Sequence, residues 1–323
     1  MYFCLKLQII YMKIFSGFEN INIESDSVVT IGTYDGIHLG HKEVLKKLTD
    51  EAEKGNYTSV VITFSPHPRL VLYPEQKDLK LVDSEEEKII KLRNLNIDIL
   101  IIIPFNKEFA ALSYTTFVEE FLIKKLNIKK FILGKDHRLG KQREGDYSAL
   151  QKLSFKYGFS VDYVSTLKYN DIEISSSKIR KAIINGDIEL ANFMIGNRFT
   201  LKARVVEGQK IGQKIGFPTA NLIVETPDKI IPGEGVYAVK VKYKNILYKG
   251  MLNIGKNPTV TNDNTIKIEV HIIDFDKNIY GDLMEIFFVK KIRDEKKFDS
   301  LDLLKEQLNN DKIAAEKFLS DLN

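Results

Sequence analysis

The pattern of apolar residues changes once along this chain, near residue 185, and this change limits the possible folds more than any other feature. Between residues 28 and 185, short apolar runs typical of buried strands alternate with helical patterns. Such alternation predicts a parallel sheet covered by helices on both faces, which is an α/β architecture. The expected strands are residues 28–31, 59–64, 97–103, 130–133 and 160–164, and the expected helices are residues 41–54, 84–95, 116–126 and 146–157.

Beyond residue 198 the chain changes to strand-like runs separated by turns rich in Gly, Pro, Asp and Asn. This pattern predicts a small antiparallel β-barrel followed by one C-terminal helix, for which Ser300 is the expected N-cap. With 323 residues in all, we expect two domains, residues 1–184 and 185–323. The expected strands are residues 200–207, 235–243, 246–254, 267–274 and 284–290, and the expected helices are residues 187–195 and 301–319.

Composition excludes several classes of protein. Hydrophobic residues make up 44% and charged residues 28%, as in ordinary globular domains. A single cysteine, Cys4, excludes an internal disulfide framework and a Cys-rich zinc site, and favours a cytoplasmic protein. The net charge of +4 is too small to indicate nucleic-acid binding, and the apolar stretch 97–105 is too short to span a membrane. Residues 1–11 lack the features of a signal peptide, so we expect an extra segment or a start at Met12.

Two histidines follow the first expected strand, in the sequence H-x-G-H formed by His38, Gly40 and His41. They lie where a strand leads into a helix, and free backbone N–H groups and the helix dipole favour phosphate there. Imidazoles three residues apart lie on one side of a helix and can donate hydrogen bonds to phosphoryl oxygens, while the glycine lets a phosphate approach closely. The alternative is a pair of surface histidines at a helix cap. Zinc is a weaker interpretation, because no third ligand of suitable spacing lies nearby.

Two other segments of the first half have the residue types of a ligand site. His67 lies in an S-P-H-P loop after the second expected strand, and two prolines make this loop rigid. A turn with an incidental histidine explains it equally well. Three serines, residues 175–177, precede Lys178 and Arg180 at an expected helix start, and together they can hold a polyphosphate. An ordinary capped helix also accounts for them.

The densest motif of the second half contains Gly208, Gly212 and Gly216, followed by Thr219 and Asn221. The glycines allow a loop to fold tightly over phosphates. In an extended chain, residues two apart face the same side, and Thr and Asn supply the neutral oxygen ligands that a phosphate-bound cation accepts. The alternative is a glycine-rich hairpin whose lysines point into solvent.

A later strand, residues 266–275, carries Glu269 and His271 on one face. Glu269 is the best candidate for a general base in transfer to a neutral hydroxyl, although a polar face of a barrel strand is the alternative. Residues 250–257 come close to a Walker A phosphate loop. The final Ser or Thr is absent and Pro258 prevents the helix that must follow, so we expect a barrel turn.

Three motifs of the first half, GTYDGIHLGH, TFSPHP and ISSSKIR, resemble the nucleotidylyltransferase half of bifunctional riboflavin kinase/FMN adenylyltransferases, the prokaryotic FAD synthetases. The resemblance implies a Rossmann-like domain in which His38 and His41 stabilise the α-phosphate of ATP during adenylyl transfer. It also implies that His67 contacts flavin. The nucleotide contacts it implies are Gly32, Tyr34, Gly40, Asp136, Ser176, Ser177 and Arg180.

The second half resembles the riboflavin kinase domain of the same family through GxxxGFPTAN, GVYAV, NIGKNPT and EVHIIDF. The resemblance implies that Thr219 and Asn221 bind Mg²⁺ with ATP and that Glu269 is the catalytic base. It assigns Gly208, Gly212, Gly216 and Asn253 to the nucleotide, and Arg293 and Phe298 of the closing R-x-E-x-x-F segment to the flavin.

The implied activity is ATP-dependent phosphorylation of riboflavin to FMN, followed by adenylylation of FMN to FAD with release of pyrophosphate. The expected partners are riboflavin, FMN, FAD and ATP, without nucleic acid or membrane. One motif departs from the family, because GKDHRLG has His137 and Leu139 where the family has phenylalanines. The alternatives are a flavin-binding regulator with an inactive adenylyl site, and a kinase whose first domain uses another nucleotide.

Overall fold

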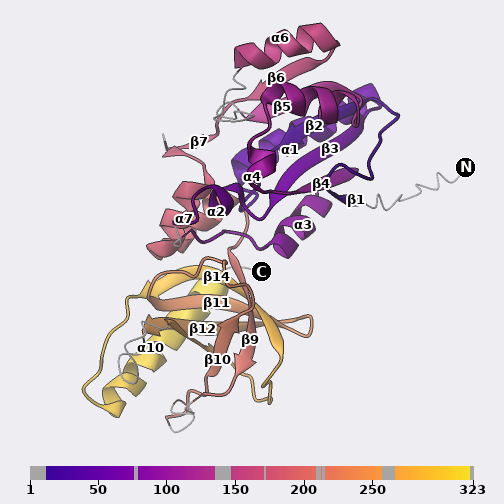
Figure 1. Ribbon diagram of the computed structural model, residues 1–323. Coiled ribbons are helices and arrows are strands. Elements are labelled where there is room, and N and C mark those ends of the chain that lie inside the picture. The colour runs from indigo at the N-terminus through magenta and orange to yellow at the C-terminus, as the bar shows by residue number, and fades with distance from the viewer. Residues whose placement is uncertain are drawn as a thin grey trace, which may run out of the picture. The chain divides into compact units, whose positions relative to one another are not determined.

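The computed structural model describes residues 12–75, 79–134, 147–170, 172–208, 212, 215–256 and 266–320 (Figure 1). The segment that precedes Met12 and the GKDHRLG motif beyond Gly134 lie outside the described residues. The chain divides into two compact units. The first comprises Met1–Leu79 and Glu85–Ile174, and the second comprises Lys80–Ser84 and Ser175–Asn323.

The first unit contains a six-stranded sheet in the order β1-β4-β3-β2-β5-β6, and all of its pairings are parallel. The predicted parallel sheet and its five expected strands are therefore confirmed. The edge strand β1 was not predicted, because three of its four side chains are exposed and form no apolar run. The strands are β1 Lys13–Ser16, β2 Ser27–Ile31, β3 Thr58–Ser65, β4 Ile99–Pro104, β5 Ile128–Gly134 and β6 Ser160–Val164.

Helices connect these strands. Three expected helices are confirmed, and the fourth, 116–126, is a short α-helix that continues as a π-helix. Two helices of four or five residues were missed, because they are too short to show a period. The elements are α1 Leu39–Gly55, α2 Pro68–Leu72, α3 Glu85–Arg93, α4 Lys107–Ala110, α5 Tyr114–Phe117, η1 Val118–Ile123 and α6 Tyr147–Tyr157, with a small hairpin of β7 Lys168–Tyr169 and β8 Ile172–Glu173.

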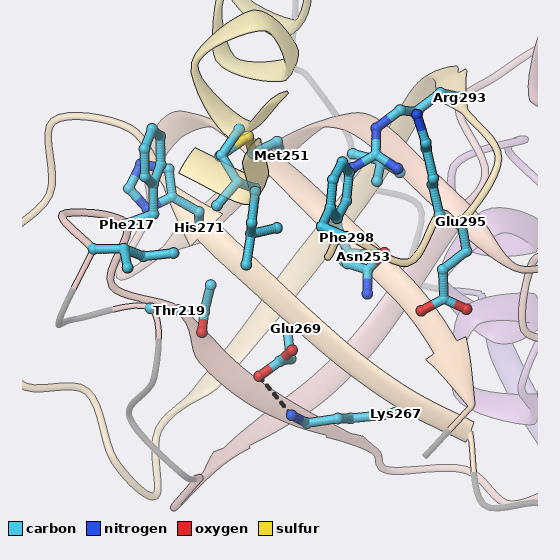
Figure 2. Close-up of a pocket in the computed structure, with 17 residues that line it drawn as sticks. Phe217, Thr219, Met251, Asn253, Lys267, Glu269, His271, Arg293, Glu295 and Phe298 are labelled. Atoms are coloured by element: carbon cyan, nitrogen blue, oxygen red, sulfur yellow. Dashed lines mark ion pairs between the residues drawn. The ribbon is translucent and has the colours of Figure 1, made fainter. Parts of the chain in front are cut away.

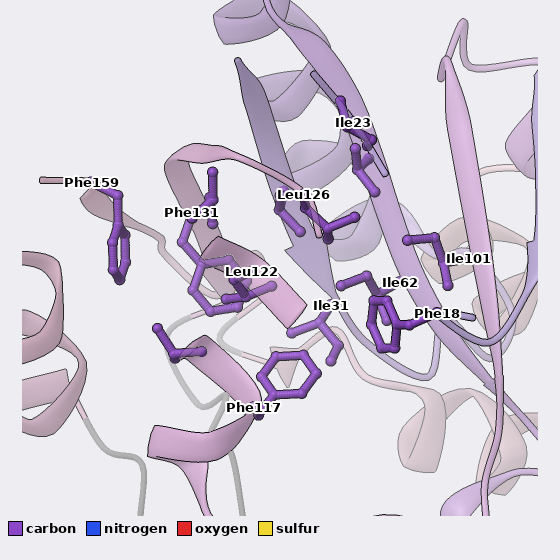
Figure 3. Packing of buried hydrophobic residues seen from close by; sticks show 14 of the residues in the cluster. Phe18, Ile23, Ile31, Ile62, Ile101, Phe117, Leu122, Leu126, Phe131 and Phe159 are labelled. Carbon is purple, nitrogen blue, oxygen red and sulfur yellow. The ribbon is translucent and has the colours of Figure 1, made fainter. Parts of the chain in front are cut away.

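Buried side chains cover both faces of this sheet. Val29 belongs to one hydrophobic cluster and its neighbour Val28 to the other, because successive residues of a strand point to opposite faces. Figure 3 shows the first cluster, in which Phe117 and Leu122 meet strand residues such as Ile31 and Ile62. Burial on both faces is the physical reason that these strands read as continuous apolar runs.

The second unit contains a closed six-stranded barrel in the order β10-β13-β12-β11-β14-β9, which confirms the predicted antiparallel barrel. The C-terminal helix α10 contacts β11, β12 and β14, and the Ser300 hydroxyl accepts a hydrogen bond from the Leu303 amide at 3.3 Å. The elements are α7 Ser176–Ile184, α8 Ile188–Ile195, β9 Thr200–Val206, β10 Ala220–Val224, β11 Gly235–Tyr243, β12 Ile246–Lys256, β13 Ile266–Ile272, β14 Leu283–Arg293 and α10 Leu301–Ser320.

The strand β10 was not predicted, because it is short and follows directly on a glycine- and proline-rich segment. Among the described residues, no helix has both the length and the apolar character needed to cross a membrane.

Candidate active sites

The H-x-G-H loop places its two imidazoles against each other at the start of α1. His38 is the N-cap of this helix, and its Nδ1 accepts a hydrogen bond from the His41 amide at 3.3 Å. The two rings stack, with centroids 3.6 Å apart and an interplanar angle of 16°. The structure therefore brings both histidines together beyond the carboxyl end of β2, where parallel sheets bind ligands.

Burial keeps both imidazoles neutral. It lowers the pKa of His38 from 6.5 to about 4, and burial together with the neighbouring His38 lowers the pKa of His41 well below its usual value. The Nδ1 atom of His41 is buried, and it has no hydrogen-bond partner among the described residues. Buried polar atoms in proteins are nearly always hydrogen-bonded, so the partner of this atom is not one of the described residues.

A buried tyrosine supports the pair from behind. The Tyr34 side chain is 2% exposed, its hydroxyl is 2.8 Å from the Thr30 hydroxyl, and its ring meets the His41 ring at a centroid distance of 5.1 Å. Burial also raises the pKa of Tyr34. The resemblance assigns this residue to the nucleotide, and in the structure it contacts Thr30 and the His41 ring.

The glycines of the motif occupy crowded positions. A Cβ atom at Gly40 would lie 3.3 Å from the His38 ring, and one at Gly32 would lie 3.1 Å from the Tyr34 ring. A side chain at either position would therefore displace an aromatic ring of the site. Ile37 adopts a positive φ of 28°, which is rare for a β-branched residue and marks local strain in the same loop.

The S-P-H-P loop lies at the same edge of the sheet. His67 is the N-cap of α2, and its Nδ1 accepts a hydrogen bond from the Arg69 amide at 3.2 Å. Sequence reasoning missed Lys88, which is only 9% exposed and donates to the Thr63 hydroxyl at 3.3 Å and to the Phe64 carbonyl at 3.2 Å. It was missed because a lysine in a charged helix normally points into solvent.

The serine cluster begins α7, as predicted. Ser175 is the N-cap and its hydroxyl accepts from the Lys178 amide at 3.5 Å, so Ser176 and Ser177 occupy the first turn and Arg180 the next. This helix belongs to the second compact unit, whereas the two histidines belong to the first. Asp136 lies outside the described residues.

The barrel unit contains a mainly apolar cavity of about 350 Å³, lined by β12, β13, the end of β14 and α10 (Figure 2). Six residues expected from sequence line it, and so do several that were not expected. The expected ones are Gly212, Thr219, Asn253, Glu269, Arg293 and Phe298, and the others include Phe217, Met251, Lys267, His271, Glu295 and Leu308.

Strand register aligns three polar residues across the barrel. Glu269 of β13 lies directly opposite Asn221 of β10 on one side and Asn253 of β12 on the other. Directly paired residues point to the same side of a sheet, so the three side chains form one row. Lys267, which sequence reasoning missed, forms an ion pair with Glu269 at 3.0 Å (Figure 2). Lys267 could have been predicted as a site residue, because it lies two residues before Glu269 and therefore on the same face of the strand.

Arg293 is held from the side of α10. Its Nε and Nη2 atoms donate to the Asp311 carboxylate at 3.0 and 2.8 Å, and that carboxylate side chain is 1% exposed. Gln307 donates to the same carboxylate at 2.9 Å. The Arg293 guanidinium lies 5.6 Å from the centre of the Phe298 ring, so an arginine and an aromatic ring form one wall of the cavity.

A second cavity of about 240 Å³ adjoins the first at Thr219, which lines both. Its other lining residues include Ala220, Val270, Phe275 and Tyr280. The glycine-rich segment before it is partly outside the described residues, but a Cβ atom at Gly208 would overlap the Asn221 amide, and Gly216 has a φ of +84°.

Comparisons with known proteins agree with this division into two sites. The family model for FAD synthetase matches residues 20–178, and that for riboflavin kinase matches residues 195–319. Fold, sites and matches define a two-domain transferase that acts on flavins with ATP. The chain is 39% identical to the bifunctional riboflavin kinase/FMN adenylyltransferase of Buchnera aphidicola subsp. Schizaphis graminum, over 96% of this chain and 99% of the relative.

The corresponding protein of Escherichia coli K12 is 36% identical over 95% of this chain and 98% of its own length. The chain therefore belongs to the bifunctional riboflavin kinase/FMN adenylyltransferase family, which confirms the predicted function: riboflavin to FMN, then FMN to FAD, both with ATP. A crystal structure described as a macrolide-efflux protein from Streptococcus pneumoniae is 32% identical, with a TM-score of 0.86 over 94% of this chain and 99% of that chain.

Proposed function

We propose that the two activities use two separate ATP sites, with His38 and His41 serving adenylyl transfer and Glu269 serving phosphoryl transfer. The observation that carries the proposal is the stacked, neutral pair of histidines with a buried, unbonded Nδ1 atom at the N-terminus of α1. This site has hydrogen-bonding groups and a helix dipole for phosphate. It has no carboxylate among its described ring contacts that could act as a strong base.

Adenylyl transfer suits such a site, because its nucleophile is the phosphate of FMN, which is already anionic. A bond forms between an FMN phosphate oxygen and the α-phosphorus of ATP, and the bond to pyrophosphate breaks. The site must align these groups and stabilise charge on the α-phosphate, which the imidazoles do by hydrogen bonding. We assign Ser176, Ser177 and Arg180 to the remaining phosphates, because they begin a helix with hydroxyl and cationic groups.

Phosphorylation of riboflavin differs, because its nucleophile is a neutral hydroxyl that gains from a general base. We assign Glu269 to this role: it accepts the proton while the γ-phosphoryl group transfers and ADP leaves. The apolar lining of the larger cavity, with Phe217, Met251 and Phe298, suits the flavin ring. We assign the nucleotide to the side of the same cavity where Gly212, Thr219 and Glu269 lie.

The donor set of the barrel fits a magnesium ion that arrives with ATP. The described residues contain no cluster of three or more His, Cys, Asp or Glu that could hold a metal. Thr219 and Asn221 instead offer neutral oxygens, as expected where phosphates and water supply most ligands. When bound, the ion neutralises phosphate charge, and these two residues orient the nucleotide toward Glu269.

Two variants of the full-length chain test the assignment. We expect His41→Ala to abolish FAD formation while FMN accumulates. We expect Glu269→Gln to abolish FMN formation from riboflavin while added FMN is still converted to FAD. The exposed Glu225→Gln is the matched control, because Glu225 pairs with Arg204 away from both cavities. Products from riboflavin or FMN with ATP and Mg²⁺ are separated by chromatography, and loss of both activities in either variant contradicts the two-site assignment.

The functional boundary is part of the same proposal. We place it at residues 184 and 185, because Ser176, Ser177 and Arg180 are assigned to adenylyl transfer. We further propose that the enzyme works in the cytoplasm, which its single cysteine and its use of ATP support. Cell fractionation with antibody detection tests this location.

A further inference from the structure

His271 is a buried titratable residue to which neither half-reaction has yet assigned a role. It lies on β13 two residues beyond Glu269 and on the same side of the strand. Its side chain is 8% exposed, and its Nδ1 atom is 2.8 Å from the Pro218 carbonyl oxygen. The Phe217 ring packs edge-on against the imidazole at a centroid distance of 5.3 Å.

The partner of this bond fixes the tautomer. A carbonyl oxygen only accepts hydrogen bonds, so Nδ1 must carry the proton and donate it. Burial lowers the pKa of His271, and Lys312 lowers it further, while the Pro218 bond and Asp274 oppose this. Lys305 and Lys312 line another cavity together with His271. The imidazole is therefore a neutral donor whose Nδ1 is already occupied, and it is not free there to take a substrate proton.

The accepting carbonyl belongs to the peptide group that links Pro218 to Thr219. Fixing this carbonyl fixes the plane of that peptide group, and with it the position of the Thr219 Cα atom. The same segment is anchored once more, because the Phe217 amide donates to the Gly212 carbonyl at 2.9 Å. His271 thus links the strand of the proposed base to the residue that borders both cavities.

We propose that His271 is a positioning residue for phosphoryl transfer, whose hydrogen bond to the Pro218 carbonyl holds Thr219 in place relative to Glu269. This inference rests on the assignment of Thr219 to the nucleotide and its magnesium ion. Loss of the bond should loosen nucleotide binding while the flavin wall, formed by Arg293 and Phe298 at the other end of the cavity, keeps its structure (Figure 2).

A pair of variants separates the hydrogen bond from the bulk of the ring. His271→Leu fills the space but has no donor, whereas His271→Asn carries an amide N–H close to the position of Nδ1. In the full-length enzyme we expect His271→Leu to raise the dissociation constant of ADP with Mg²⁺ about tenfold, which corresponds to the loss of one hydrogen bond. Riboflavin affinity should change less than twofold, and His271→Asn should recover most of the ADP affinity. Isothermal calorimetry measures both ligands without turnover.

Several results would overturn the proposal. These are an ADP affinity within twofold of wild type in His271→Leu, an equal loss of riboflavin and ADP affinity, or an Asn variant no better than Leu. Glu269→Gln distinguishes a wrong role for His271 from a wrong assignment of the catalytic base. If Glu269→Gln still phosphorylates riboflavin, the assignment of Glu269 as the base is itself wrong.

A measurement on the wild type keeps the proposal testable if His271→Leu does not fold. The chain has five histidines, so nitrogen-15 NMR of histidine-labelled protein can be assigned with single His→Asn variants. We expect His271 to show a protonated Nδ1 and a bare Nε2 at pH 7. A proton on Nε2 instead would exclude the bond to the Pro218 carbonyl and with it the proposed role.

Discussion

At the residue scale, two imidazoles buried at a helix N-terminus make the first unit sensitive to acid. The pKa of His38 is about 4 in the folded chain and about 6.5 once it is exposed. Between these values the unfolded state binds more protons than the folded state, so stability falls as pH decreases. The loss begins near pH 6.5 and levels off below pH 4, and His41 changes it in the same direction.

We therefore predict that His38→Asn makes unfolding less dependent on pH. At pH 5 the linkage for His38 alone corresponds to about 2 kcal/mol of lost stability relative to pH 7. Urea unfolding of wild type and variant at both pH values should show a pH difference smaller by about that amount in the variant. Equal pH differences in the two proteins would mean that His38 is not buried as a neutral imidazole.

At the element scale, α10 does more than cover the barrel, because its buried Asp311 carboxylate holds Arg293 in the wall of the cavity that we propose for the flavin. Removing the charge leaves a guanidinium without its partner in a largely buried position, which costs about 3 kcal/mol. The wall formed by Arg293 and Phe298 depends on this pair. The substitution should therefore weaken riboflavin binding more than nucleotide binding.

We predict that Asp311→Asn raises the KM for riboflavin about tenfold or more, with a smaller change in the KM for ATP, and lowers the melting temperature by several degrees. Asp302→Asn, in the exposed first turn of the same helix, is the matched control and should change neither. Steady-state kinetics and a thermal melt decide. A larger effect on ATP than on riboflavin would contradict the role of α10 as a flavin wall.

Elements were predictable from sequence where burial imposes a period. The central strands β2 to β5 of the first unit are mostly buried on both faces, and β9 of the barrel alternates between more and less buried residues, so their composition reveals them. The short strands β1 and β10 escape, because neither has an apolar run long enough to stand out. In the sites, motifs predicted His38 and Glu269, but not Asp311 or Lys88, whose burial is set by contacts with distant parts of the chain.

At the scale of the whole molecule, the second unit includes a segment from the first half of the chain. Leu81 pairs with the stretch around Lys229: its amide donates to the Asp228 carbonyl at 2.7 Å, and its carbonyl accepts from the Ile230 amide at 2.8 Å. The Lys229 ammonium donates to the Val82 carbonyl at 2.7 Å and lies 3.9 Å from the Asp83 carboxylate. A pairing between residues 147 apart leaves no local signal, so the expected two-domain division did not include it.

We predict that Lys229→Ala destabilises the second unit by about 3 kcal/mol, because it removes a buried cation that lies 3.9 Å from the buried Asp83 carboxylate. Hydrogen exchange should show the loss in the barrel strands, with the sheet of the first unit unaffected. Lys80→Ala is the matched control, since Lys80 also donates to a carbonyl, that of Pro227 at 3.0 Å, but from an exposed position. Equal effects of the two substitutions would show that burial of Lys229 is unimportant.

The row of Asn221, Glu269 and Asn253 across three neighbouring strands limits how the sequence of such a chain can evolve. Side chains alternate along a strand, so one residue inserted into β13 before Glu269 would move the carboxylate to the opposite side of the strand, which Val270 now occupies. Because the barrel is closed, neighbouring strands leave no open edge along which β13 could slip to restore its register. Point substitutions can therefore adjust this site one side chain at a time, whereas changes in length must be confined to the loops.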